Sequence, residues 1–73
     1  MSSLHDPRYR TIIDRLRKLR ESKRVTQVDL ASCLKKHQSY VAKVENCERR
    51  LDIIELQDWL KALEIEITSF LKE

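Results

Sequence analysis

The chain has 73 residues, of which 41% are hydrophobic and 37% are charged, and its formal net charge is +3. This length suffices for a single small domain, residues 1–73, with residues 1–6 expected to be flexible. No apolar run approaches the roughly 18 residues that a membrane-spanning helix needs, and no secretory segment is recognisable. Two cysteines, Cys33 and Cys47, are too few for a disulfide framework. Together these features predict a cytoplasmic protein.

Charge is distributed unevenly along the chain. Residues 1–50 hold 13 Lys and Arg against 6 Asp and Glu, whereas residues 51–73 hold 2 against 6. A basic segment attracts a polyanion and an acidic, apolar segment does not, so we expect the two parts to have different partners. The alternative is ordinary solvated helix surface.

The first predicted helix covers about residues 7–22. Asp6 can cap it, and Pro7 suits its first turn because no amide hydrogen is needed there. Apolar residues then recur from Ile12 to Leu19 at the spacing of one helix face.

Two short helices are predicted next, over about residues 27–34 and 38–46. Thr26 with Asp29 three residues later has the pattern of a capping box, which marks the start of a helix. After a break, apolar residues resume at helical spacing with Val41.

The C-terminal part predicts two further helices. Asp52 with Glu55 repeats the capping pattern and opens a helix that runs to about residue 63, and a last short helix holds Phe70 and Leu71. No stretch indicates a strand with an evident partner. The sequence therefore predicts an all-α fold, a compact bundle of about five short helices.

The second and third predicted helices are joined by a turn of about three residues, which is the arrangement of a helix-turn-helix. In that motif the second helix lies in the DNA major groove, and its N-terminal residues reach the base edges. Such a helix needs exposed polar side chains at its start. Gln38, Ser39 and Tyr40 stand there, and Lys43 follows one turn later.

The run "TQVDLASCL…HQSYVAKVENCERRLD" resembles the helix-turn-helix domain of phage-repressor and Cro type, the XRE family, and the similarity covers roughly residues 9–71. The resemblance implies a lambda-repressor-like DNA-binding domain of five helices. It also implies a homodimer on a two-fold symmetric operator in double-stranded DNA, and transcriptional regulation, such as repression, as the task.

The same resemblance suggests which residues touch DNA. Gln27 is expected to donate to a phosphate, and Gln38 to read adenine, whose N7 and N6 a carboxamide can bond together. Ser39 can contact a base or a phosphate, and Lys43 a guanine or a phosphate. Tyr40 is expected either to lie on a sugar with its hydroxyl on a phosphate or to pack within the protein. As alternatives, Gln27 is a plain first-turn residue and Gln38 caps its own helix.

Four cations flank the predicted reading helix, with Lys35 and Lys36 before it and Arg49 and Arg50 after it. We expect them to contact the DNA backbone and to make the affinity salt-dependent; solubilising surface charge is the alternative.

The resemblance also implies an ion pair between Arg20 and Glu45 that bridges the first helix to the end of the third. A bidentate contact between guanidinium and carboxylate would fix the tilt of the recognition helix.

The chain contains no glycine, although the family commonly has one at the helix ends where Lys35, Cys47 and Glu64 stand. Because a positive φ costs other residues about 1 kcal/mol, we expect these turns either to be strained or to differ in geometry. His37 stands where Ser or Thr would cap the third helix, so the start of that helix is expected to shift by up to one residue.

Chemistry that would support catalysis is sparse in this sequence. Cys33, His37 and Cys47 are the candidate zinc ligands, but they are one short of a closed site, and sharing a helix face would abolish the turn at 35–37. Neither a nucleophile–base pair nor a phosphate-binding glycine loop is present. The sequence predicts no metal, no cofactor and no enzymatic activity.

The C-terminal part has more large apolar residues than one face of two short helices needs. Trp59, Ile67, Phe70 and Leu71 are candidates for a surface that pairs two chains and places two recognition helices about one DNA turn, roughly 34 Å, apart. The same surface can instead hold a toxin-like protein partner, as in antitoxins of this family, or simply complete a small core.

Overall fold

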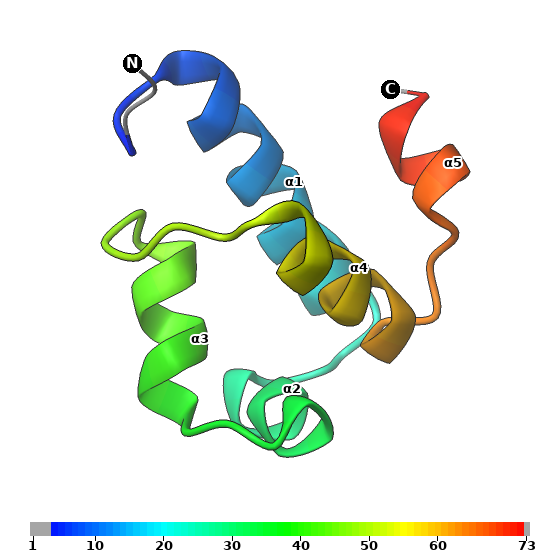
Figure 1. Cartoon of the computed structure of the whole chain (residues 1–73). Helices are drawn as coiled ribbons and strands as arrows, with labels where there is room; N and C mark the ends of the chain where they lie inside the picture. The colour runs from blue at the N-terminus through cyan, green and yellow to red at the C-terminus, as the bar shows by residue number, and fades with distance from the viewer. Residues whose placement is uncertain (1–3, 73) are drawn as a thin grey trace.

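The computed structural model describes residues 4–72; residues 1–3, which belong to the segment expected to be flexible, and residue 73 lie outside the described residues. Within the described part the chain forms five α-helices and no strand, which confirms the predicted all-α fold (Figure 1). The helices are α1 (Pro7–Ser22), α2 (Gln27–Leu34), α3 (Gln38–Glu45), α4 (Ile53–Ala62) and α5 (Ile67–Leu71). Helices α3 and α4 each end one residue before the predicted boundary.

The capping residues identified in the sequence begin three of these helices. Asp6 accepts a hydrogen bond from the backbone amide of Arg8 at the start of α1. Hydrogen bonds from the side chain and backbone of Arg8 lower the pKa of the Asp6 carboxyl to about 2. Helices α2 and α4 both begin with complete capping boxes, formed by Thr26 with Asp29 and by Asp52 with Glu55.

All five helices contribute to one core. Helices α1 and α4 lie in the middle of the molecule, with α3 on one side and α5 on the other (Figure 1). The buried apolar residues are Ile13, Leu16, Leu30, Ala31, Val41, Val44, Trp59, Leu60, Leu63 and Phe70. The arrangement therefore holds α3 at the edge of the bundle, with one face packed inward and the other open.

The core includes two of the four residues expected at a dimer interface. Trp59 and Phe70 are only 1% and 2% exposed, so they fill the core of the single chain and offer no surface to a partner. Ile67 packs partly buried against the same core, and Leu71 is 62% exposed. Most of the large apolar residues of the C-terminal part therefore pack within the single chain.

Four helices end in the left-handed conformation without glycine. Within residues 4–72, the residues at positive φ are Arg24, Lys35, Cys47 and Glu64, with φ of 60, 58, 57 and 60°. After each of them the next amide donates to the carbonyl five residues back, as in Lys36 to Ala31 at 2.9 Å and Ile65 to Leu60 at 2.8 Å. This is the usual helix-ending hydrogen bond that glycine favours. The four turns therefore have the ordinary helix-ending geometry, and their non-glycine residues bear the energetic cost of a positive φ.

Replacing Glu64 by glycine should stabilise the protein by about 1 kcal/mol, because Glu64 is exposed and glycine adopts φ of 60° without a Cβ penalty. Urea unfolding followed by circular dichroism measures the change. Lys61→Gly, in the last turn of α4, is the control and should destabilise by a similar amount. Destabilisation by both substitutions would show that Glu64 contributes a contact that outweighs its strain.

Candidate nucleic-acid interface

The turn between α2 and α3 sets the angle between these two helices of the helix-turn-helix. Lys35 takes the left-handed conformation and ends α2, and His37 is extended and begins α3 without a side-chain cap. Despite the missing cap, α3 starts at Gln38, so the shift of its start that was expected from His37 does not occur. Val41 and Val44 point into the core with 0% exposed surface. One side of α3 is therefore fixed against the protein.

The opposite side of α3 carries the polar residues expected to read bases. Gln38, Ser39 and Lys43 are all exposed. Because residues three and four apart share a helix face, Ser39 and Lys43 lie one above the other on this side. The structure thus brings these three predicted contacts together on one open helical surface.

A buried ion pair joins α1 to the end of α3. The Arg20 guanidinium donates from Nε to Oε2 of Glu45 at 2.6 Å and from its NH2 nitrogen to Oε1 at 3.0 Å. The two side chains are only 8% and 1% exposed. Arg20 also donates to the carbonyl oxygen of Val25 at 2.7 Å, so a single guanidinium ties α1, the loop after it and α3. The pair implied by the resemblance is formed, and it has a third partner that the sequence did not reveal.

Two glutamine amides extend this ion pair to the exposed start of α3. Gln27 Nε2 donates to Oε1 of Glu45 at 2.9 Å, and Gln38 Nε2 donates to Oε1 of Gln27 at 2.7 Å. A continuous polar chain therefore runs from Arg20 through Glu45 and Gln27 to Gln38. Sequence reasoning placed Gln27 and Gln38 separately on DNA and missed the link between them.

Tyr40 packs within the protein. Its hydroxyl accepts a hydrogen bond from the indole Nε1 of Trp59 at 3.1 Å, and the two rings meet edge to face with centroids 6.1 Å apart. Burial raises the pKa of the Tyr40 hydroxyl. This contact anchors the first turn of α3 to α4, and the hydroxyl still has its own proton to donate.

Cations from both sides of α3 converge on the Tyr40 ring. The Lys36 ammonium lies 5.3 Å from the ring centroid, and the Arg49 guanidinium lies 4.7 Å from it. Arg49 also pairs with Glu55 at 3.1 Å, while Arg50 is exposed. The turn before α3 and the loop after it thus contribute positive charge to the same region.

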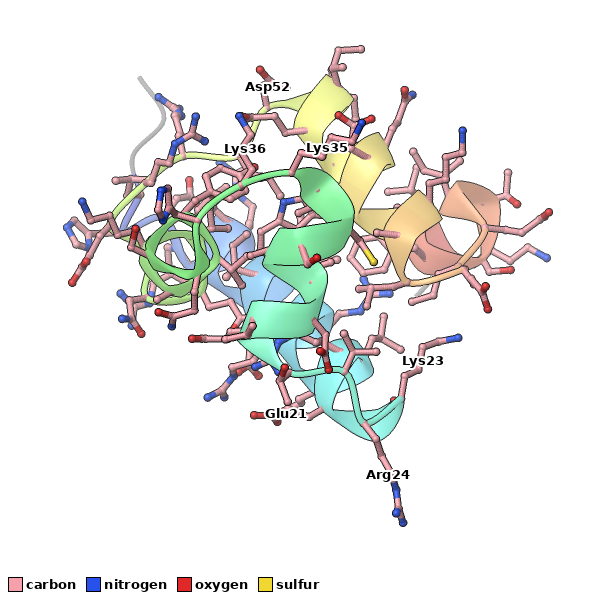
Figure 2. All side chains as sticks on the ribbon, turned by 90° about the horizontal axis from the view of Figure 1, so that it is seen from below. Glu21, Lys23, Arg24, Lys35, Lys36 and Asp52 are labelled. Carbon is pink, nitrogen blue, oxygen red and sulfur yellow. The ribbon has the colours of Figure 1, made fainter. Side chains whose placement is uncertain are left out.

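Figure 2 shows Lys35 and Lys36 together at the turn that follows α2. Both side chains are exposed. Of the four predicted flanking cations, Lys36 and Arg49 lie over the Tyr40 ring of α3. Lys35 lines a pocket with residues of α4, and Arg50 lines one at the start of α4.

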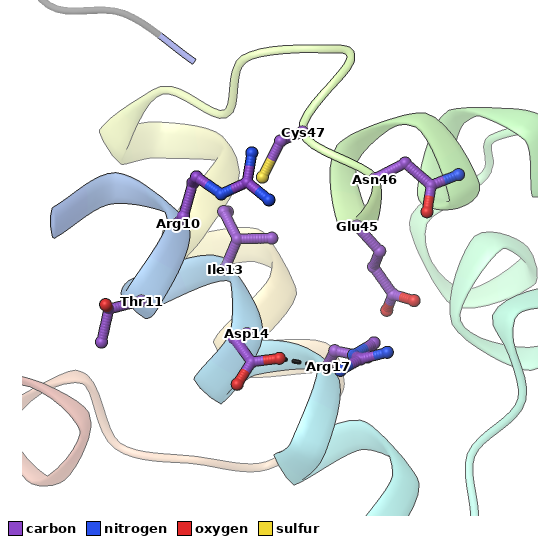
Figure 3. Close-up of a pocket in the computed structure, with 8 residues that line it drawn as sticks. All are labelled: Arg10, Thr11, Ile13, Asp14, Arg17, Glu45, Asn46 and Cys47. Atoms are coloured by element: carbon purple, nitrogen blue, oxygen red, sulfur yellow. Dashed lines mark hydrogen bonds and ion pairs between the residues drawn. The ribbon is translucent and has the colours of Figure 1, made fainter. Parts of the chain in front are cut away.

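A cleft lies between α1 and the end of α3, and it contains side chains of both signs of charge (Figure 3). Its lining residues are Arg10, Thr11, Ile13, Asp14, Arg17, Glu45, Asn46 and Cys47. Arg17 pairs with Asp14 at 2.8 Å, and hydrogen bonds from Lys18 and Arg17 lower the pKa of that carboxyl. Because its charges are largely paired, this cleft offers no strong attraction to an anion.

The zinc ligands considered from the sequence are not assembled into a site. Cys33 is an exposed free thiol, Cys47 is a partly exposed one, and the turn at Lys35 ends α2 before His37. Among residues 4–72, no three His, Cys, Asp or Glu side chains form a group that could hold a metal. Over the same residues, no helix has the length and apolarity to cross a membrane.

Comparison with known proteins agrees with this geometry. A model of the helix-turn-helix family matches residues 16–70. An XRE-family-like protein from Pseudomonas syringae pv. tomato str. DC3000 is 38% identical, with a TM-score of 0.88, and the match covers 93% of this chain and 83% of that one. This chain belongs to the XRE family of helix-turn-helix proteins.

Two restriction-modification controller proteins have similar structures. C.AhdI from Aeromonas hydrophila is 32% identical with a TM-score of 0.73, and the match covers 81% of this chain and 89% of that one. A point mutant of C.Esp1396I is 28% identical with a TM-score of 0.78, and the match covers 84% of this chain and 77% of that one. A search of curated proteins gives no match.

Membership of the XRE family confirms the fold and the family expected from the sequence. XRE-family helix-turn-helix proteins are non-enzymatic DNA-binding regulators, which agrees with the absence of catalytic motifs from the sequence. The polar face of α3 and the cations around it are therefore the candidate DNA interface of this XRE-family protein.

Replacing Arg20 by Met should destabilise this XRE-family protein by about 3–5 kcal/mol, because the Glu45 carboxylate would stay buried without its cation. Urea unfolding at neutral pH measures the loss. The double variant Arg20→Met with Glu45→Leu is the control and should recover most of the stability, since no buried charge remains. A single variant as stable as the wild type would show that the ion pair does not hold α3.

Proposed function

We propose that this protein is a sequence-specific, double-stranded DNA-binding transcriptional regulator that inserts α3 into the major groove. The observation that carries the proposal is the two-sided character of α3. Val41 and Val44 are 0% exposed on its inner side, and Gln38, Ser39 and Lys43 are exposed on its outer side. In helix-turn-helix proteins the second helix reads base edges through such a polar side.

Contacts to the DNA backbone are assigned to the elements around α3. Gln27 opens α2, where its remaining amide hydrogen and the positive end of the helix favour a phosphate. Tyr40 has a hydroxyl proton to donate beside the cations that flank it. The flanking cations Lys35, Lys36, Arg49 and Arg50 complete this set. Such contacts position the protein and make its affinity salt-dependent.

We further propose that two copies bind a two-fold symmetric operator. Exposed apolar residues on α4 and α5 support pairing of chains: Ile53, Ile54 and Leu71 are 58%, 61% and 62% exposed. A two-fold dimer places two recognition helices about one DNA turn apart. Leu71 and the partly buried Ile67 are the members of the predicted interface that remain available to a partner.

The biological role proposed is cytoplasmic transcriptional control, for example repression, without a cofactor. Two of the similar structures are restriction-modification controller proteins, which supports a regulatory task. The exposed apolar residues on α4 also support a second candidate, a toxin-like protein partner bound to the same surface.

Selection from a randomised duplex library, at two salt concentrations, tests this function. We expect enrichment of a two-fold symmetric site whose affinity falls as salt rises. An enriched single half-site would contradict the dimer while leaving base reading intact. Weak, unselective retention at both salt concentrations would contradict the DNA-reading function and favour the protein partner.

Replacing Arg49 by Met should weaken binding to all duplexes alike and reduce the slope of log affinity against log salt by about one unit. The guanidinium lies beside α3, over Tyr40, where a phosphate contact is proposed. Lys18→Met is the control, because it removes one positive charge from the side of α1 near Phe70 and α5. Loss of affinity for only some sequences would instead assign Arg49 to base reading.

A further inference from the structure

A hydrogen bond ties the loop between α3 and α4 to the start of α1. The backbone amide of Leu51 donates to the hydroxyl oxygen of Tyr9 at 2.9 Å. We infer that Tyr9 is a positioning residue for the proposed contact between Arg49 and the DNA backbone. Tyr9 precedes residues 16–70, which the family model matches, so a segment outside that region contributes to the interface. The inference rests on the proposed function and deepens it, because it concerns how one phosphate contact is presented.

The middle of this loop is placed by α1. The amides of Arg49 and Asp52 bind the helices that flank the loop: Arg49 donates to the Lys43 carbonyl of α3 at 3.2 Å, and Asp52 donates within the capping box of α4. The Leu51 amide instead reaches Tyr9, 42 residues earlier in the chain. The position of Leu51 relative to α1 therefore depends on the Tyr9 hydroxyl.

The bond from Tyr9 also sets the direction of the Arg50 carbonyl. This carbonyl and the Leu51 amide belong to one peptide group, which is planar, so holding the N–H in one direction fixes the C=O as well. The Arg49 Nη1 nitrogen donates to the same carbonyl oxygen at 2.8 Å. The peptide group is thus bound at both of its polar ends, by Tyr9 on one side and by Arg49 on the other.

The Arg49 guanidinium is left with one edge free. Its Nη1 nitrogen also pairs with Glu55 at 3.1 Å, so both Nη1 hydrogens have acceptors. Among residues 4–72, no acceptor contacts its Nε or Nη2 nitrogen. Hydrogens on both of these nitrogens form the fork that can bind a phosphate at two points. The carbonyl held by Tyr9 therefore determines which edge of the guanidinium faces away from the protein.

Removal of the Tyr9 hydroxyl should loosen this arrangement without removing the ring. Tyr9 and Leu51 are both partly buried against the core, so phenylalanine keeps the packing while the Leu51 amide loses its acceptor. An amide without a partner is disfavoured away from water, so the peptide group should turn outward and take the Arg50 carbonyl with it. Arg49 then keeps Glu55 but loses a second anchor, and it loses more freedom when it binds a phosphate.

The first arm of the test uses the free protein and does not depend on DNA. In Tyr9→Phe, hydrogen exchange of the Leu51 amide should accelerate about fivefold beyond any change at Leu16, which lies in the core. The side-chain resonances of Arg49 should shift, because its carbonyl acceptor moves. Thr11→Val is the control, since it removes another hydroxyl hydrogen bond of α1, and it should change neither signal. If either signal stays in place in Tyr9→Phe, the inference is overturned.

The second arm measures affinity for the selected duplex at several salt concentrations. Tyr9→Phe should reduce the slope of log affinity against log salt by about one unit, as Arg49→Met does. The ratio of affinities for the selected duplex and one with a changed base pair should be kept, because the reading face of α3 is untouched. Adding Tyr9→Phe to Arg49→Met should weaken binding no further, since Tyr9 acts through Arg49. A wild-type slope, a changed ratio or losses that multiply would each overturn the inference.

The two arms separate this inference from the proposed function. A protein that binds no duplex but shows the expected changes in the first arm would overturn the proposed function and the role in phosphate contact, while the positioning of Arg49 by Tyr9 stands. A wild type that selects DNA, with a slope unchanged in Tyr9→Phe, would overturn the inference and leave the proposed function intact.

Discussion

The orientation of α3 depends on the buried pair between Arg20 and Glu45. Helix α3 has eight residues and fully buries only Val41 and Val44, with Tyr40 partly buried against the same core, so polar contacts supplement a small apolar contact area. The guanidinium binds the carboxylate at two points and also the Val25 carbonyl, so it defines both distance and angle between α1 and α3. Such a pair is costly to desolvate and adds little net stability, but it penalises every arrangement that separates its charges.

A second polar contact fixes the other end of the same helix. Tyr40, in the first turn of α3, accepts from Trp59 on α4, while Glu45 occupies the last turn. Trp59 is 1% exposed, so its indole N–H needs a partner inside the protein, and Tyr40 supplies it. With one anchor at each end, α3 is tied to α1 and α4 together, and its outer face can remain polar without loosening the helix.

Residue patterns predicted what depends on neighbouring residues. Among tertiary contacts, the family resemblance implied the ion pair between Arg20 and Glu45, and the rest of the polar chain was missed. Helix starts followed from local pairs such as Asp52 with Glu55, because a capping box needs only residues three apart. The hydrogen bond between Gln27 and Gln38 joins residues eleven apart on two helices, and no periodicity reveals it. Trp59 was a candidate for an interface, because the sequence shows an excess of apolar residues in the C-terminal part but does not show which of them are buried in the core. Arg24 was overlooked at its positive φ, because an exposed arginine carries no turn signal.

Replacing a strained residue by glycine would not have the same consequence at every helix end. At Lys35 the left-handed conformation sets the turn before α3, and the same residue is one of the four cations proposed to contact the DNA backbone. Glycine would relieve the backbone there but would remove the charge, so strain and function are joined in one residue. At Arg24 and Glu64 no such contact is proposed, and the strain only lowers stability. A small core that tolerates four strained ends must rely on contacts that do not require apolar area. The polar chain from Arg20 through Glu45 and Gln27 to Gln38 is such a contact, because it joins α1, α2 and α3 and extends to the exposed start of α3.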